Sequence, residues 1–527
     1  MNDKYMKILQ VSILSLAFFV LTYQPVNDPD FGWHLASGMY YLQHWSVPSH
    51  DIFSWTAPHY PWVNHEYAAD ALYAFLYQLG NNTTLLLSLL FAALAAYLFL
   101  DVLPKLCVQK PDWKQRFLIG FPALLIAKPF FGVRSQVFDW LAIALVLFLW
   151  QLYTRTNNKK VLWGFPFLFL IWANIHGGFP LGLAMLAGMM FFYLYQLCTQ
   201  CHSRESGNPA NIDSGFPIKS GMTMSRTIFS RLIREQRNTI FLFLAVLALS
   251  FLTTFFTIYH YHLYVDFIQT SQGKQLFQFI AEWAPSTIGT LNSIPFFCYL
   301  FLFILLLLEE REQQPLSFQD TLFFLFFLFS ALSYVRFIPL FAVISLPVIY
   351  RRFPKSQIMP EALAFVVFAG FMISQISLTS GSHKTTLTQT PFVSSLFDTH
   401  QKAFYSDIPI DAFAWLKTHP PAGGLPPRMF NTYGWGGEII WQLPNQPVFI
   451  DGRMPYWNVD NRLLFQDYLT IEQVSPKWYE TIQHYDIQWF FISSKSPLAA
   501  ALEQLPDKWE KKYHDEQAIV FYKKGLR

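Results

Sequence analysis

Long apolar stretches, separated by short polar segments, fill most of the first 378 residues of this chain. Stretches of about 20 apolar residues are typical of helices that cross a bilayer, and shorter ones are tolerated where neighbouring helices cover them. Eleven stretches qualify, at residues 6–24, 82–103, 117–131, 137–153, 161–175, 179–197, 239–258, 293–308, 320–334, 337–350 and 360–378. The pattern therefore predicts an α-helical polytopic membrane domain over residues 1–378.

The remaining residues, 379–527, have shorter apolar elements separated by polar turns and glycines. Helices are expected at 410–418, directly after the glycines of 434–437, at 476–485 and at 497–505. An apolar run occupies 428–433, and strands are expected at 447–451, 487–493 and 518–523. Short helices alternating with short strands predict a small C-terminal α/β soluble domain.

Composition supports this division of the chain. Hydrophobic residues make up 53% of it and charged residues only 13%, about half the ~25% of soluble proteins. The apolar content excludes a disordered chain, and a net charge of +3 is too small for a nucleic-acid binder. All four cysteines precede residue 379, which excludes a disulfide framework in the C-terminal domain.

Lys and Arg residues predict how the helices are oriented. Loops on the side of the N-terminus carry 19 of them, and the opposite side of the membrane body carries four. Basic loops face the cytoplasm, so the N-terminus and the basic insertion 199–237 are expected inside. The first outer loop (25–81) and residues 379–527 would then lie in the periplasm, next to a bacterial inner membrane.

Ionisable residues outside the cytoplasmic loops fall almost entirely at the outer ends of predicted helices. They are Asp28, Asp30, His34, His65, Glu66, Arg134, His176, Glu282 and Arg336. Ionisable groups close to lipid are costly and usually line cavities, so the set predicts a catalytic cleft at the outer surface. The alternative is interfacial anchoring and capping of helix ends.

Several segments containing these residues resemble GT-C glycosyltransferases, which are polytopic enzymes that use polyprenyl-phosphate sugars. The matching segments are NDPDFGWHLASG (27–38), VPSHDIFSWTAP (47–58), PWVNHEY (61–67), VRSQ (133–136), NIHGGF (174–179), AEWAP (281–285) and VRFIP (335–339). In the soluble domain, YGWGGEIIW (433–441) and VFIDGR (448–453) resemble the soluble domain of a bacterial branch of these enzymes. The resemblance covers most of the chain except 199–237.

The resemblance implies that an acidic residue of the first outer loop is catalytic, and glycosyl transfer needs a base that takes the proton of the acceptor. Asp30 and Asp28 are the candidates. Asp30 is favoured because Phe31 and Trp33 beside it would desolvate its carboxylate and make it more basic. Asp28 could instead serve only in an Asp-Pro turn.

The remaining candidates would bind the two substrates. Arg134, Arg336 and His176 could hold the donor phosphate, because a guanidinium matches phosphate geometry, although a helix-end arginine such as Arg336 could also simply snorkel to the interface. His34, His65, Glu66, Glu282 and Trp283 are candidates for acceptor or sugar binding. Asp30 with Glu66 could bind a divalent metal ion through carboxylate oxygens.

The sequence thus predicts an inverting GT-C-type glycosyltransferase. It would transfer a sugar from a polyprenyl-phosphate donor to a lipid, glycan or protein acceptor at the periplasmic face, among membrane lipids. An oligosaccharide ligase or protein glycosyltransferase would use the same fold. A lipid-linked sugar transporter or flippase, or a non-enzymatic membrane scaffold, would also fit the predicted membrane topology. A transporter places polar residues at mid-membrane depth, whereas here they lie at the outer rim.

Overall fold

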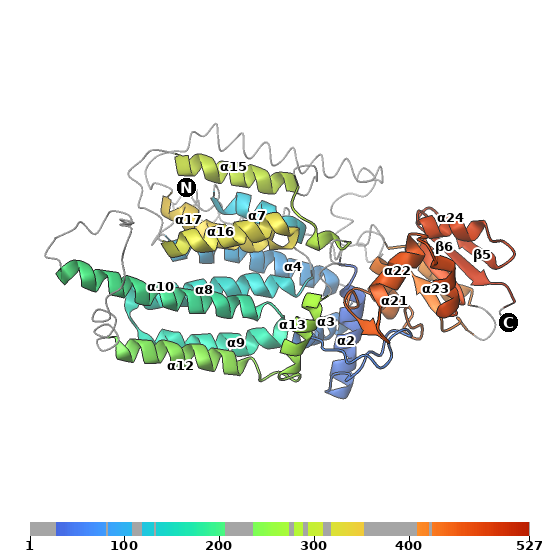
Figure 1. The fold of residues 1–527 in the computed structure, drawn as a ribbon, viewed down its shortest axis with the longest axis horizontal. Coiled ribbons are helices and arrows are strands. Elements are labelled where there is room, and N and C mark those ends of the chain that lie inside the picture. The colour runs from blue at the N-terminus through green and yellow to red at the C-terminus, as the bar shows by residue number, and fades with distance from the viewer. Residues whose placement is uncertain are drawn as a thin grey trace, which may run out of the picture.

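A bundle of long helices carries a small α/β domain at one end (Figure 1). The computed structural model describes residues 28–80, 83–107, 119–130, 133–205, 236–272, 279–287, 293–308, 318–352, 408–420 and 424–525. The predicted spans 6–24 and 360–378, the predicted domain boundary at 378–379 and most of the insertion 199–237 lie outside these residues. The other nine predicted spans fall on helices.

The bundle is built from helices that follow one another along the chain. In order, they are α4 (Thr83–Tyr97), the π-helical turn η1 (Leu98–Val102), α5 (Leu103–Cys107), α7 (Phe121–Ala127), the 3-10 turn η3 (Lys128–Phe130), α8 (Gln136–Thr156), the 3-10 turn η4 (Lys159–Trp163), α9 (Gly164–Ile175), α10 (Phe179–Glu205), α12 (Arg237–Thr253), α15 (Ile294–Leu308), α16 (Phe318–Ser333) and α17 (Ile338–Arg352). By length and composition, α8 and the Phe179–Leu197 part of α10 could each cross a membrane.

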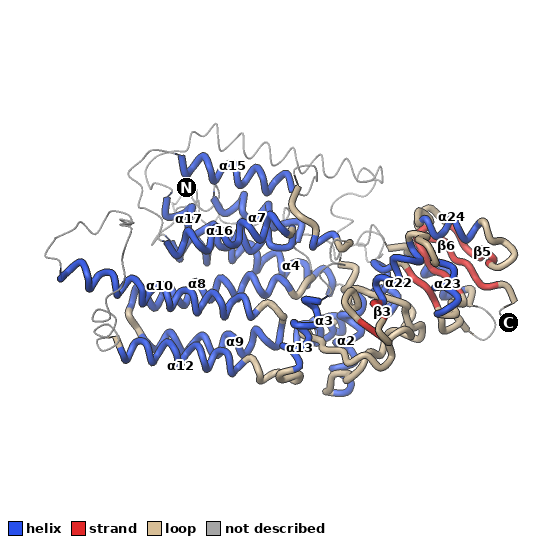
Figure 2. Tube along the Cα trace, viewed as in Figure 1, coloured by secondary structure: helices blue, strands red, loops and turns tan. Residues whose placement is uncertain are grey.

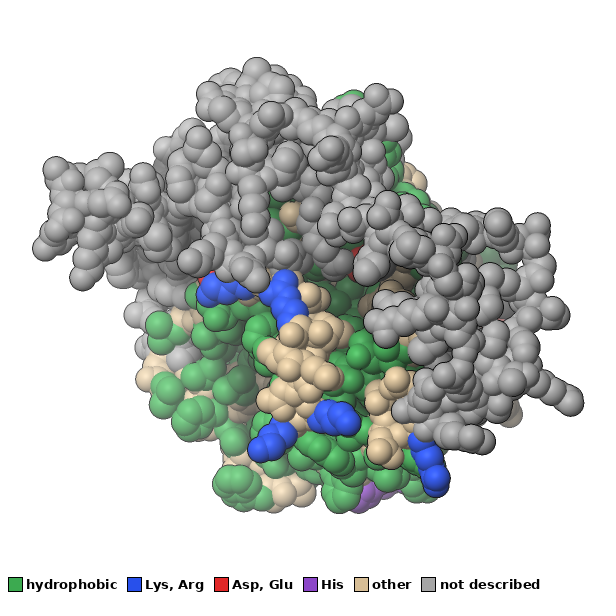
Figure 3. Space-filling model, turned by 90° about the vertical axis from the view of Figure 1, so that its left-hand side faces the viewer, with side chains coloured by type: hydrophobic (Ala, Val, Ile, Leu, Met, Phe, Trp, Pro, Cys, Tyr) green, Lys and Arg blue, Asp and Glu red, His purple; other side chains and the backbone are tan. Residues whose placement is uncertain are grey.

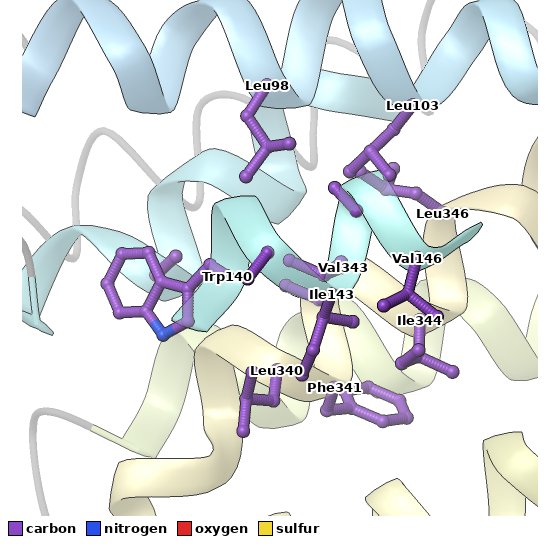
Figure 4. Packing of buried hydrophobic residues seen from close by; sticks show 14 of the residues in the cluster. Leu98, Leu103, Trp140, Ile143, Val146, Leu340, Phe341, Val343, Ile344 and Leu346 are labelled. Carbon is purple, nitrogen blue, oxygen red and sulfur yellow. The ribbon is translucent and has the colours of Figure 1, made fainter. Parts of the chain in front are cut away.

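Apolar side chains pack the centre of the bundle and also cover its outside. Figure 4 shows Leu103 of α5 next to Leu346 of α17, and Ile143 of α8 above Phe341 of α17, all within one buried cluster. On the outside, large side chains such as Phe329 of α16 remain 71% exposed. A helix that is apolar on every side suits a lipid environment, which agrees with membrane insertion of this bundle.

Basic side chains gather at the end of the bundle opposite the α/β domain, the end that faces the viewer in Figure 3. Lys105 lies in the last turn of α5, Arg155 in the last turn of α8, and Lys159 and Lys160 in η4. Arg155 donates a hydrogen bond of 2.8 Å to the carbonyl of Leu106 and so joins two of these helix ends. This arrangement agrees with the basic loops on which the predicted orientation depends.

The α/β domain contains the strands of the described chain, gathered at one end of the molecule (Figure 2). Its sheet has the order β1 (Met429–Asn431), β4 (Trp489–Ser493), β6 (Ala518–Lys523) and β5 (Trp509–His514), with β1 parallel to β4 and the other pairs antiparallel. The helical elements are α20 (Ile410–Thr418), the 3-10 turn η9 (Tyr433–Trp435), α21 (Gly436–Gln442), α22 (Leu464–Glu472), α23 (Trp478–His484) and α24 (Pro497–Glu503). A short hairpin joins β2 (Asn458–Val459) to β3 (Arg462–Leu463).

One expected strand of this domain is wrong. Residues 447–451 do not enter the sheet, and only Val448 pairs, through an isolated parallel bridge to Ser54 of the first outer loop. The segment is buried and apolar like a central strand, but its backbone partners come from the other domain. Trp55 donates to the carbonyl of Val448 at 3.1 Å, and Val448 donates to the carbonyl of Phe53 at 3.0 Å.

Four outer segments lie between the bundle and the α/β domain. They are α2 (Phe31–His44) and α3 (Tyr67–Gln78) of the first outer loop, α13 (His262–Gln272), and the 3-10 turn η5 (Ala281–Trp283). Figure 1 shows α2, α3 and α13 where the helical bundle meets the α/β domain. The first outer loop and η5 together carry most of the predicted site residues.

Candidate active site

An ion-paired cluster lies at the start of α2, where the first outer loop meets the bundle. Arg134, two residues before α8, pairs with Asp28 through Nε–Oδ2 at 2.7 Å and Nη2–Oδ1 at 3.2 Å. Its Nη1 also pairs with Glu282 of η5. The other oxygen of Glu282 accepts a hydrogen bond of 3.4 Å from Gln136. Arg134 is therefore neutralised by two carboxylates and holds three segments together.

Asp30 stands next to this cluster, at the residue that precedes α2. Its backbone N–H donates to Asp28 Oδ1 at 3.0 Å. Burial raises the pKa of the Asp30 carboxyl to about 7, and the negative charge of Asp28 adds to the effect, against the opposing charges of His34 and Arg134. Asp30 thus has the basicity that a general base needs near neutral pH.

Arg336 differs from Arg134 in its partners. It lies in the 3-10 turn η7 (Val335–Phe337), and its guanidinium carbon stands 4.3 Å from the ring centroid of Trp283. Glu282 is within electrostatic reach, but among the described residues no hydrogen bond or ion pair within 4 Å engages the Arg336 guanidinium. A partly buried cation with unused donors can bind an anion.

Glu66 is the centre of a second cluster, built from three histidines. His34 Nε2 approaches Glu66 Oε2 to 3.4 Å, while His65 Nε2 and His176 Nε2 approach Oε1 to 3.3 and 3.2 Å. Burial by itself would raise the pKa of Glu66, but hydrogen bonds from His176 and His65 and the charge of His34 bring it well below the usual range. Glu66 therefore stays ionised.

Each of these histidines has a further carboxylate on its other ring nitrogen. His34 Nδ1 lies 2.6 Å from Oδ1 of Asp70 in α3. The other carboxylate oxygen of Asp70 accepts a hydrogen bond of 2.7 Å from the Asn64 side-chain amide. Burial lowers the pKa of His34, but the charge and hydrogen bond of Asp70 outweigh it and raise this pKa to about 9. His34 and Asp70 thus form a buried ion pair behind Glu66.

The other two histidines connect the same cluster to the bundle and to α13. His176 follows the last residue of α9, and its Nδ1 lies 2.7 Å from Asp139 in the first turn of α8. His65 Nδ1 lies 4.0 Å from Asp266 of α13. Tyr456 of the α/β domain donates to Asp266 at 2.9 Å, so the C-terminal domain reaches the edge of the cluster.

Two overlapping sets of side chains have the spacing of a metal site. They are His65, Glu66 and His176, and His34, Glu66 and Asp70, with ligand atoms in each set within 4.8 Å of one another. Imidazole with carboxylate suits a divalent transition metal. Glu66 belongs to both sets, whereas Asp30 belongs to neither, so the ligands that the geometry offers beside Glu66 are three histidines and Asp70.

The structure thus brings the predicted residues into one connected layer at the outer end of the bundle. Three further carboxylates of this layer, Asp70, Asp139 and Asp266, are absent from the set that the sequence predicts. Asp139 lies just inside a predicted span, where the rarity of carboxylates in apolar helices is an available signal. Asp70 and Asp266 lie in the outer loops, and no signal in the sequence pairs them with particular histidines.

Two solved structures are similar in fold to almost the whole chain. Archaeal oligosaccharyltransferase AglB from Archaeoglobus fulgidus, in complex with an inhibitory peptide and a dolichol-phosphate, has a TM-score of 0.53 at 11% identity, covering 99% of this chain and 75% of that chain. ArnT from Cupriavidus metallidurans bound to undecaprenyl phosphate has a TM-score of 0.52 at 12% identity, covering 99% and 98%. The chain has the GT-C glycosyltransferase fold. By sequence, no family model and no curated protein matches it.

The predicted fold class is therefore confirmed: a helical GT-C body with a small C-terminal α/β region. The GT-C proteins it matches are membrane proteins, and the apolar outer surface of the bundle agrees with an integral membrane protein. Within this GT-C fold, both charged clusters lie at the end of the bundle next to the C-terminal domain.

Proposed function

We propose that this protein is an inverting GT-C-type glycosyltransferase that moves a sugar from a polyprenyl-phosphate donor to an acceptor at the periplasmic face of a bacterial inner membrane. One observation carries the proposal. At one end of a GT-C fold, a carboxylate of raised pKa, Asp30, lies next to the ion-paired cluster of Arg134. Arg336, a cation without an ion-pair partner among the described residues, lies within electrostatic reach of Glu282 in the same cluster. These are the two groups that glycosyl transfer from a phosphate donor requires.

Asp30 would act as the general base. It takes the proton of the acceptor hydroxyl while that oxygen attacks the anomeric carbon of the sugar. The bond between the anomeric carbon and the phosphate oxygen breaks, and its electron pair leaves with the polyprenyl phosphate. Attack from the face opposite the leaving group inverts the anomeric configuration. A carboxylate with a pKa near 7 holds this proton better than one with an ordinary pKa, which favours the transfer.

Arg336 would stabilise the departing phosphate, because fixed cations act on charge that develops in the transition state. Its guanidinium is held over Trp283, which orients it without using its hydrogen-bond donors. Arg134 would have a structural role instead, since two carboxylates already neutralise it. It would fix Asp28 and Glu282 in place, and His176 could add a donor near the phosphate.

The second cluster would bind the acceptor or a divalent cation. His65, Glu66 and His176 are the residues that would hold a cation, and such an ion would supply positive charge beside the leaving phosphate. Without an ion, Glu66 can accept hydrogen bonds from sugar hydroxyls, and His34 and His65 position it. The residues fit both roles.

The ligands of the structural neighbours support the class of donor. AglB was solved with a dolichol-phosphate and ArnT with undecaprenyl phosphate, and both ligands are polyprenyl phosphates. The AglB complex also contains an inhibitory peptide, which makes a protein acceptor one of the three acceptor classes to be tested.

The test is transfer from a radiolabelled polyprenyl-phosphate sugar to lipid, glycan and peptide acceptors by the full-length protein in nanodiscs. Asp30→Asn should reduce kcat at least 1000-fold, and Arg336→Ala should raise KM for the donor and lower kcat. Lys508→Ala, at an exposed lysine of the soluble domain, serves as the control. Full activity of both site variants at normal protein levels would refute the site. Movement of labelled donor across proteoliposomes without transfer would indicate a transporter instead.

A further inference from the structure

The first outer loop and the soluble domain meet around a buried arginine of the soluble domain. Arg453 donates from Nη1 to Asp51 of the outer loop at 2.8 Å. It also donates from Nε and Nη2 to the two oxygens of Asp451 at 2.8 and 2.6 Å. The side chains of Asp51 and Asp451 are fully buried. Removing one member of such a group leaves the other charges buried without a partner, which is strongly destabilising.

Aromatic rings enclose the same guanidinium. Its carbon lies 4.5 Å from the ring centroid of Trp62 and 5.0 Å from that of Phe53, and Trp33 and Trp457 stand at 5.9 and 5.3 Å. Three of these rings belong to the first outer loop. Planar stacking with bidentate pairing is a geometry that Arg provides and Lys does not. Arg453 therefore fixes the outer loop against the soluble domain.

The residue before Arg453 touches the proposed base. A Cβ added at Gly452 would overlap the Asp30 carboxylate and would lie 2.6 Å from its Cγ. Gly452 is not among the glycines with positive φ, so its backbone does not require glycine. The requirement comes from the space taken by Asp30. At the neighbouring helix α21, a Cβ on Gly437 would similarly overlap the carbonyl oxygen of Pro29.

We propose that the soluble domain completes the active site, with residues 451–453 as its positioning element: Arg453 locks the outer loop through Asp51, and Gly452 closes over the carboxylate of Asp30. The inference rests on the proposed function of Asp30 as the base. Contact with Gly452 removes water from one side of that carboxylate, and the loss of water is the largest cause of its raised pKa. The domain thereby contributes to catalysis without supplying a catalytic residue.

Gly452→Ala is the direct test, with Gly434→Ala as its matched control. Gly434 lies in the same domain, and a Cβ there meets nothing within 4 Å. The extra methyl at position 452 must displace Asp30, so kcat should fall at least 100-fold while KM for the donor changes less than threefold. Gly434→Ala should keep the activity of the unmodified protein.

Arg453→Lys is the second variant, with Arg462→Lys as control. Arg462 also pairs with a carboxylate through two nitrogens, Nε and Nη2 to Asp467 at 2.7 and 3.0 Å, but this carboxylate belongs to the soluble domain itself. Arg453→Lys should lower kcat at least tenfold. It should also move the acid limb of the kcat/KM profile to lower pH by one unit or more, because a loosened loop lets water reach Asp30. A purely structural role would lower protein yield and leave the pH profile of the remaining enzyme unchanged.

Asp30→Asn separates the two proposals. If it abolishes transfer while Gly452→Ala and Arg453→Lys keep the normal rate and pH profile, the positioning role is wrong and the proposed function stands. If Asp30→Asn is fully active, the proposed function of this residue is wrong, whatever the other variants do. Size-exclusion chromatography confirms that each assayed variant is folded, and Gly452→Ala decides the outcome if Arg453→Lys does not accumulate.

Discussion

The raised pKa of Asp30 predicts that its substitution stabilises the protein while abolishing its activity. The pKa moves from an ordinary value of 3.8 to about 7, a change of about 3 units that corresponds to about 4 kcal/mol. A carboxyl whose pKa is higher in the folded than in the unfolded state is destabilising wherever it must ionise. This penalty is complete above pH 7, shrinks as the pH falls from 7 to 3.8, and is absent below 3.8.

Asp30→Asn should therefore raise stability at pH 8 by up to about 4 kcal/mol, and by much less at pH 4.5. The amide keeps the size of the side chain and the backbone hydrogen bond to Asp28. The assay is thermal unfolding followed by tryptophan fluorescence at a fixed scan rate, at both pH values. Asp460→Asn, at an exposed carboxylate of the soluble domain, should change little. An Asp30→Asn midpoint at or below that of the unmodified protein at pH 8, or an equal gain at both pH values, would refute the reasoning.

Three further predictions concern the two clusters. Arg134→Ala leaves the buried carboxylate of Asp28 unpaired and should destabilise the fold by about 3–5 kcal/mol, seen as a lower unfolding midpoint; an unchanged midpoint contradicts the central place of this ion pair. The pKa of His34 is raised from 6.5 to about 9, so the stabilisation of the fold by protonated His34 is complete below pH 6.5 and is lost between pH 6.5 and 9. The midpoint temperature of thermal unfolding should therefore fall over that pH range, and should fall less in His34→Gln. Trp283→Ala should weaken binding of undecaprenyl phosphate about tenfold by releasing Arg336, measured by calorimetry in detergent, whereas equal affinity would show that the stacking does not orient the cation.

The helical bundle could be predicted from the sequence because its signal is local. A run of apolar residues identifies a span without reference to any other part of the chain, and the predicted 137–153 corresponds to α8 (Gln136–Thr156). The same apolar pattern does not single out Asp139, which lies in the first turn of that helix and whose carboxylate faces His176. One charge does not alter the average hydropathy of a span, so the pattern treats this residue as part of the span.

The convergence of charges at the outer helix ends could also be predicted, but their pairing could not. Alternate crossing of a membrane brings helix ends together in two layers, which places Asp28, Arg134 and Glu282 on one side. Which carboxylate neutralises which arginine depends on rotations and offsets of the helices that the sequence does not display. The structure assigns both carboxylates to Arg134 and leaves Arg336 stacked on Trp283.

The strand expected at 447–451 shows a further limit of local patterns. A short apolar run indicates burial of the chain but does not indicate what buries it. Here the partner of Val448 is Ser54 in another domain. The missing strand and the contact between the outer loop and the soluble domain therefore have one cause.

The pairing of Asp51 with Arg453 has a consequence for the synthesis of the protein. The two residues are 402 positions apart in the chain, and translation at about 5–20 residues per second separates their appearance by about 20–80 s. During this interval the outer loop is already made, but its partner has not yet been synthesised. Asp30 can contact Gly452 only after the soluble domain has been synthesised and has folded. Under the proposed positioning role, a truncated or stalled chain would therefore lack activity even where its helices have inserted into the bilayer.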